Sequence, residues 1–111
     1  MTGNEYQKLA MRTCNISYEN RLDMARHAVF GLCSEAGEVA GILQKEYQGH
    51  AVDTEHIEKE LGDTLWMIAE AATAFGFTLE EVMEANIEKL RNRYPNGFDT
   101  EHSLHRKQGD I

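Results

Sequence analysis

The apolar positions of this chain recur with a helical period in four stretches, and no stretch alternates convincingly as a β-strand. They predict helices from about Asn4 to Cys14, from Arg21 to Tyr47, from just after Asp53 to Phe75 and from Leu79 to Arg93. The second stripe continues for about seven turns, which makes this helix the longest. A short connection between the second and third helices predicts an antiparallel pair.

Local signals bound these helices. A capping box of the form T-x-x-E opens the first and the fourth, and an aspartate and a glycine bound the third. The residues are Thr2 with Glu5, Thr78 with Glu81, and Asp53 and Gly76. We expect an all-α domain over residues 1–98, a four-helix-bundle-like unit completed by dimerisation. Residues 99–111 are polar and are expected to form a flexible tail.

Three glycines interrupt the long second helix, namely Gly31, Gly37 and Gly41. Glycine costs about 1 kcal/mol in a helix interior relative to alanine. Three of them in one helix predict the close approach of a neighbouring element or a ligand.

Composition narrows the function classes. The 111 residues suit one domain, and the net charge of −8 argues against a broad basic surface for duplex nucleic acid. No apolar run approaches the ~20 residues that a membrane span needs, and no basic-then-apolar leader opens the chain. We therefore expect a cytoplasmic protein that binds neither membrane nor duplex nucleic acid.

Two pairs of acidic residues share one geometry. Glu35 and Glu38 lie three residues apart on the second helix, and Glu60 and Asp63 lie three apart on the third. At ~100° per residue, both pairs fall at about −100° and −160° from the centre of their apolar stripe. In antiparallel neighbours such equal offsets point to the same side. The four carboxylates are therefore predicted to converge.

Converging carboxylates repel one another. Two unit charges 4 Å apart cost ~1 kcal/mol in water and ~4 kcal/mol at an effective dielectric of 20. A hard divalent cation removes that cost, and all-oxygen ligation selects Mg²⁺, Mn²⁺ or Ca²⁺ over Zn²⁺. The alternative is that these acids are solvated on exposed helix faces.

Basic and amide side chains lie on the apolar face of the fourth predicted helix, where core residues are expected. Asn86, Lys89 and Arg93 share the sector of the fourth helix that carries its apolar residues. A phosphate chain is one partner that would compensate them. Lys45 lies seven residues beyond Glu38, about 10 Å along the second helix, a gap that a triphosphate can span. Trp66, Phe30 and His27 are further candidates, for stacking on a base.

The motifs together resemble the MazG-like all-α nucleotide pyrophosphohydrolases, over roughly residues 5–99. The resemblance rests on Glu35-x-x-Glu38, Glu60-x-x-Asp63 and Asn86-x-x-Lys89-Leu-x-x-Arg93-Tyr94-Pro95. It implies hydrolysis of (d)NTP to (d)NMP and pyrophosphate by a dimer or tetramer. It also implies Mg²⁺ on Glu35, Glu38, Glu60 and Asp63, replaceable by Mn²⁺, and phosphate binding by Lys45, Asn86, Lys89 and Arg93.

One residue departs from the family pattern, which often has a further Glu where Ser34 stands. A carboxylate such as Glu38 could orient or deprotonate the attacking water, and would then be catalytic. A different class of function, a non-enzymatic helical interaction protein, stays open. Within the fold, a phosphoribosyl-ATP hydrolase or a dUTP/dUDP-specific hydrolase is also open, and the preferred base is not fixed.

Overall fold

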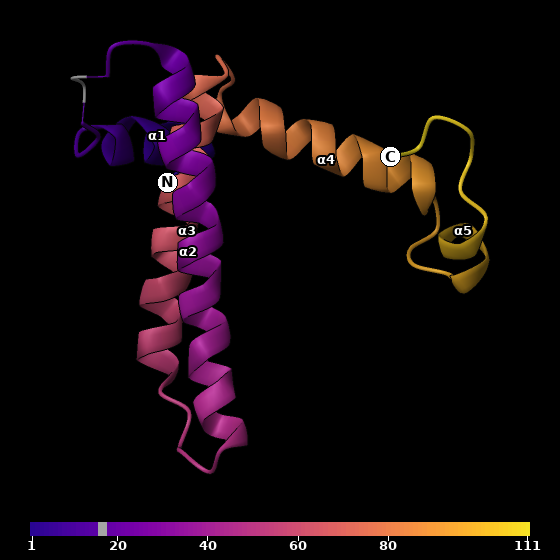
Figure 1. Ribbon diagram of the computed structural model, residues 1–111. Helices are drawn as coiled ribbons and strands as arrows, with labels where there is room; N and C mark the ends of the chain where they lie inside the picture. Colours follow the sequence, from indigo (N-terminus) through magenta and orange to yellow (C-terminus); the bar gives the residue numbers. More distant parts are fainter. Residues whose placement is uncertain (16–17) are drawn as a thin grey trace. The chain divides into compact units, whose positions relative to one another are not determined.

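The computed structural model describes residues 1–15 and 18–111. It contains the helices α1 (Gly3–Met11), α2 (Arg21–Tyr47), α3 (Thr54–Ala74), α4 (Leu79–Arg93) and α5 (Thr100–Leu104) (Figure 1). Over these residues it has no strand, only an isolated bridge between Pro95 and Gly97. The all-α prediction is confirmed. The chain divides into two compact units, Met1–Leu79 and Glu80–Ile111, which are described separately.

The predicted helix boundaries agree closely with the structure. α2 and α4 have the predicted ends, whereas α1 stops at Met11, earlier than expected. The capping box of Thr2 and Glu5 is present, and the Asp53 carboxylate accepts from the backbone N–H of His56 at the start of α3. Gly76 follows α3 with a φ of 80°, the left-handed conformation that glycine adopts most easily.

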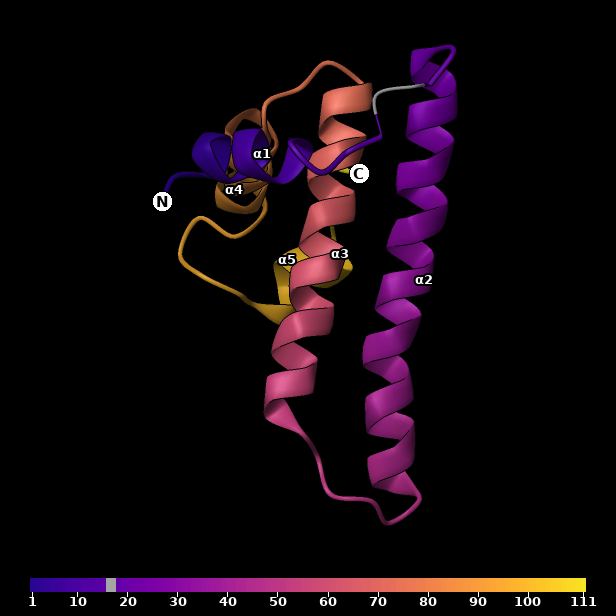
Figure 2. The ribbon, with the colours of Figure 1, turned by 90° about the vertical axis from the view of Figure 1, so that its left-hand side faces the viewer.

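The first unit is built on an antiparallel hairpin of α2 and α3, which lie side by side along their lengths (Figures 1 and 2). Small side chains face each other near the open end of the hairpin. Ala25 and Ala28 of α2 and Ala69 and Ala72 of α3 are buried there. These small side chains let the two helices approach closely.

Close approach also explains one of the three glycines of α2. A Cβ on Gly31 would overlap the sulfur of Met67 on α3. No atom outside the local helix backbone lies within 4 Å of a Cβ built on Gly37 or Gly41. Among the described residues, the predicted close neighbour is therefore present at Gly31 and at neither of the other two glycines.

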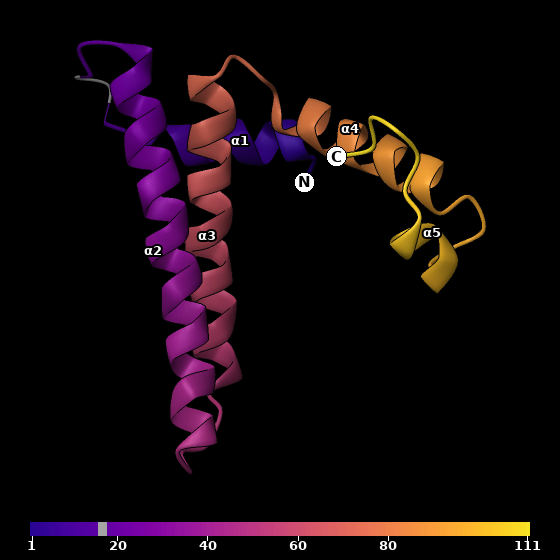
Figure 3. The ribbon, with the colours of Figure 1, turned by 45° about the vertical axis from the view of Figure 1, so that its right-hand side comes forward.

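The Gln7 side chain joins α1 to the end of the hairpin. The Gln7 amide nitrogen donates to Thr73 Oγ1 at 2.9 Å and to the Phe77 carbonyl at 3.0 Å. The Gln7 amide oxygen accepts from the Leu79 N–H at 2.7 Å. α1 is thereby held across α3, as Figure 3 shows.

The buried apolar core is small. Among the described residues it comprises five alanines and one leucine: Ala25, Ala28, Ala69, Ala72, Ala74 and Leu79. Larger apolar side chains remain exposed on α2, α3 and α4, including Phe30 at 71% and Leu61 at 53%. A chain with this distribution retains extensive apolar surface. In the described part, no helix is both long and apolar enough to cross a membrane.

The polar segment after residue 98 contains a helix that the sequence did not predict. α5 is capped by Asp99, whose carboxylate accepts from the backbone N–H of His102 at 2.7 Å. Beyond α5 the chain returns to α4, where Asp110 pairs with Arg93. The sequence predicted a flexible tail over residues 99–111, and within it the structure has the short helix α5.

Candidate functional site

Three of the four predicted metal ligands meet between α2 and α3. Glu35 of α2 and Glu60 and Asp63 of α3 each place a carboxylate oxygen within 4.8 Å of the others. Glu35 and Glu60 are half-buried, and Asp63 is exposed. The antiparallel hairpin brings the two helix faces together, and the three-residue spacing puts both α3 acids on one face.

Glu38 lies outside this cluster and is exposed. Its charge still acts on the site. Desolvation raises the pKa of Glu35 above its ordinary value, and the carboxylates of Asp63, Glu60 and Glu38 raise it further. The predicted convergence is thus found for three acids. The assignment of Glu38 as a ligand and as the catalytic base stays a prediction.

Two neighbours of the cluster were missed by sequence reasoning. His56 Nε2 lies 2.8 Å from Glu60 Oε1, one helical turn earlier on α3. Tyr6 of α1 has a raised pKa, first because it is partly buried and second because the Asp63 carboxylate is near. The i,i+4 spacing of His56 and Glu60 was the available signal for the first contact.

The donor set fits a divalent cation. Among the described residues, the three ligand atoms that converge here are carboxylate oxygens, the ligand type that hard cations prefer. Desolvation first, and then repulsion from the neighbouring carboxylates, raises the pKa of Glu35, and a bound cation would favour its charged form. The cluster of Glu35, Glu60 and Asp63 can therefore hold a divalent metal ion.

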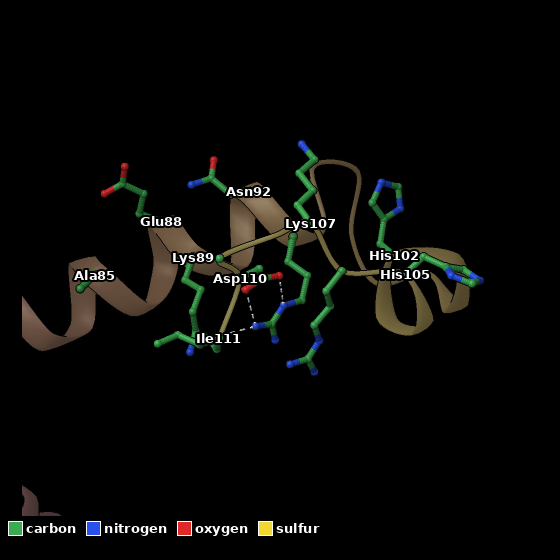
Figure 4. A pocket seen from close by; sticks show the side chains of 12 residues that line it. Ala85, Glu88, Lys89, Asn92, His102, His105, Lys107, Asp110 and Ile111 are labelled. Carbon is green, nitrogen blue, oxygen red and sulfur yellow. Dashed lines mark hydrogen bonds and ion pairs between the residues drawn. The ribbon is translucent and has the colours of Figure 1, made fainter.

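The predicted phosphate-binding residues lie on α2 and α4. Lys45 is exposed in the last turn of α2, and Asn86 is exposed on α4. Lys89 and Arg93 line a pocket of about 550 Å³ within the second unit, together with residues that follow α5 (Figure 4). Arg93 is largely buried, because Asp110 binds its guanidinium in two places.

The three candidates for base stacking differ in whether their rings are already held by other residues of the chain. The Trp66 indole N–H donates to the Ala10 carbonyl at 3.1 Å and lies 2.9 Å from Thr13 Oγ1, so the ring is fixed against α1. His27 is bound to Glu70. Phe30 remains 71% exposed on α2 and has the freest ring face.

A buried carboxylate joins several elements of the first unit. Glu70 has no exposed side-chain surface, yet it accepts from the Tyr18 hydroxyl at 2.8 Å. His27 Nδ1 lies 2.9 Å from each Glu70 oxygen, and Cys14 Sγ lies 3.8 Å from Oε1. Burial raises the pKa of Tyr18 to about 12, with a further contribution from the Glu70 contact. Sequence reasoning did not identify this network.

Comparisons with known proteins agree with the geometry. The profile of the MazG nucleotide pyrophosphohydrolase domain matches residues 26–98, which include all four acidic motif residues. The gene 37 protein of Mycobacterium phage L5 is 29% identical over 76 residues, covering 64% of this chain and 67% of that protein. The comparison with solved structures found no match. The profile spans most of the chain, so the protein belongs to the MazG nucleotide pyrophosphohydrolase family.

Proposed function

We propose that this protein hydrolyses nucleoside or deoxynucleoside triphosphates to the monophosphate and pyrophosphate, with Mg²⁺ as the cofactor and Mn²⁺ able to replace it. The observation that carries the proposal is the convergence of Glu35, Glu60 and Asp63 between α2 and α3. Family membership supports the reaction class.

The acidic cluster holds the cation in this proposal. Glu35, Glu60 and Asp63 supply the oxygen ligands, and His56 fixes the orientation of Glu60. When bound, Mg²⁺ neutralises phosphate charge and lowers the pKa of coordinated water. Phosphoryl transfer otherwise depends mainly on positioning and electrostatics, which these residues provide.

Glu38 is the proposed base. It is exposed, and it lies one turn beyond Glu35 on α2, close enough to influence its pKa. Its carboxylate accepts a proton from the water as the water oxygen bonds to the α-phosphorus. The bond from that phosphorus to the bridging oxygen breaks, and pyrophosphate leaves.

Other residues bind the substrate. Lys45, Asn86, Lys89 and Arg93 contact the phosphates, as the family resemblance implies. Phe30 is the side chain most available to stack on the base, because Trp66 and His27 already hold partners in the chain.

We further propose that the protein is a homodimer or homotetramer. The support is the exposure of large apolar side chains combined with a core made mostly of alanine. Burial of apolar area contributes roughly 25 cal/mol per Å², so covering these residues would stabilise each subunit.

The decisive experiment is a screen of all NTPs and dNTPs, including dUTP, with dUDP and phosphoribosyl-ATP added. Products are resolved so that pyrophosphate is distinguished from orthophosphate. We expect metal-dependent formation of monophosphate and pyrophosphate from at least one triphosphate, and none when a chelator is present. Release of orthophosphate and diphosphate would contradict the mechanism. No turnover would favour the non-enzymatic interaction protein.

A further inference from the structure

The pocket of the second unit is strongly basic. Four lysine and arginine side chains line it, against two acidic side chains. The side chains of the lining therefore carry a formal excess of two positive charges before any histidine is protonated. The cations are Lys89, Arg93, Arg106 and Lys107, and the acids are Glu88 and Asp110. The segment after α5 contributes half of these cations. A pocket of this charge favours an anion.

The pocket already contains an anion that belongs to the chain. Asp110 Oδ2 accepts from Arg93 Nε at 2.8 Å, and Oδ1 accepts from Nη2 at 2.7 Å. Both side chains are mostly covered, at 10% and 16% exposure. Figure 4 shows Asp110 lying against α4 beside Lys89.

The local chain geometry positions this carboxylate. Gly109 has a φ of 85°, and the N–H of Asp110 donates to the Lys107 carbonyl at 3.1 Å, so the chain turns just before Asp110. The pKa of Asp110 is lowered, first by its hydrogen bonds with Arg93 and also by the charges of Arg106 and Lys89. Asp110 is thus held as an anion among the residues that line the pocket.

The bidentate contact is the one that a phosphate group would make. A guanidinium fork binds a carboxylate or a phosphate through the same parallel N–H donors. Those Arg93 donors cannot serve a phosphate while Asp110 occupies them. The segment that carries Asp110 lies outside the family match, which ends at residue 98.

We propose that Asp110 is an internal competitor for phosphate at Arg93, so that the segment 105–111 must release Arg93 before a phosphate chain binds there. The proposal rests on the proposed function in one respect, the role of Arg93 as a phosphate ligand. The anion concerned is a pyrophosphate group, either in the substrate or as the released product. The contact is therefore autoinhibitory.

The test compares binding of inorganic pyrophosphate to the wild type, Asp110→Asn and Glu84→Gln by calorimetry. Glu84→Gln is the matched control, because it removes one negative charge from an exposed residue of the same unit that does not line the pocket. If Arg93 is free in about a tenth of molecules, Asp110→Asn binds pyrophosphate about 10-fold more tightly. The control changes affinity by less than about 2-fold if the effect is specific to the Arg93 contact. Equal effects of the two substitutions, or no effect of either, would overturn the proposal.

A second measurement uses the unaltered protein. Amide hydrogen exchange of residues 107–111 should become faster when pyrophosphate binds, because the turn that holds Asp110 is released. Slower or unchanged exchange in this segment would mean that Asp110 does not compete.

Nucleotide turnover is measured in parallel and separates the two claims. If nucleotides are turned over but Asp110→Asn has no selective effect, the proposed hydrolysis stands and the proposed competition of Asp110 with phosphate is overturned. If Asp110→Asn has a selective effect but no nucleotide is turned over, the competition is supported and the proposed hydrolysis is overturned.

Discussion

At the residue scale, the Glu60 side chain makes two contacts that matter for the candidate site. The carboxylate belongs to the acidic cluster, and it also contacts the imidazole of His56 at 2.8 Å. Groups that orient a metal ligand commonly affect metal affinity by 10- to 100-fold. His56 is half-exposed, so we place it near the lower end of that range.

We predict that His56→Ala raises the Mg²⁺ concentration needed for half-maximal turnover by about 10-fold, because Glu60 loses its partner. His56→Gln should recover part of the loss, since its amide can still donate to the carboxylate. The measurement is turnover over a Mg²⁺ titration. A wild-type Mg²⁺ dependence in His56→Ala would show that the contact has no role in metal binding.

At the scale of elements, helical periodicity and end signals were sufficient for α2 and α4. Their apolar stripes are long, and their boundaries agree with the structure. The equal offsets of the acid pairs predicted that four carboxylates would converge, and three of them, Glu35, Glu60 and Asp63, do so. These features depend on residues close in sequence or on one simple hairpin.

Long-range contacts were beyond that reasoning. Glu70 lies on the buried face of α3 because Tyr18 and His27 approach it, and periodicity carries no information about such partners. α5 has only five residues, too few for a periodic signal, and Asp99 was the one local indication of its start. The pairing of Arg93 with Asp110 was also missed, because periodicity does not identify partners that are distant in sequence.

We predict that Glu70→Ala lowers the free energy of unfolding by about 3 kcal/mol, because it removes the hydrogen bonds of a buried carboxyl group and leaves the Tyr18 hydroxyl without this acceptor. Urea unfolding measures the change. Glu58→Ala, at an exposed acid of the same helix, should change it by less than about 0.5 kcal/mol. Comparable losses in both variants would mean that the network does not stabilise the fold.

At the scale of the molecule, the main feature to explain is that large apolar side chains are exposed to solvent. The buried apolar residues are mostly alanines, whereas Phe30, Leu43 and Leu61 are more than half exposed. Where such side chains form a contiguous patch, the patch marks an interaction site. The family resemblance suggests that further copies of the chain cover it.

We accordingly predict a stable homo-oligomer at micromolar concentration, most simply a dimer. Sedimentation velocity over a range of concentrations gives the mass directly. A monomer that persists at tens of micromolar would contradict the prediction, and the exposed apolar residues would then need a different partner.

The central claim is that Glu35, Glu60 and Asp63 hold the divalent ion. Its most direct test is the melting temperature of the protein during a Mg²⁺ titration, for the wild type, Asp63→Asn and the exposed-acid control Glu58→Gln. A ligand that binds only the folded state stabilises it by mass action, by about 2.7 kcal/mol at 100 times its dissociation constant. We predict a rising melting temperature for the wild type and the control, and little rise for Asp63→Asn. An equal rise in all three proteins would contradict the assignment of the metal site.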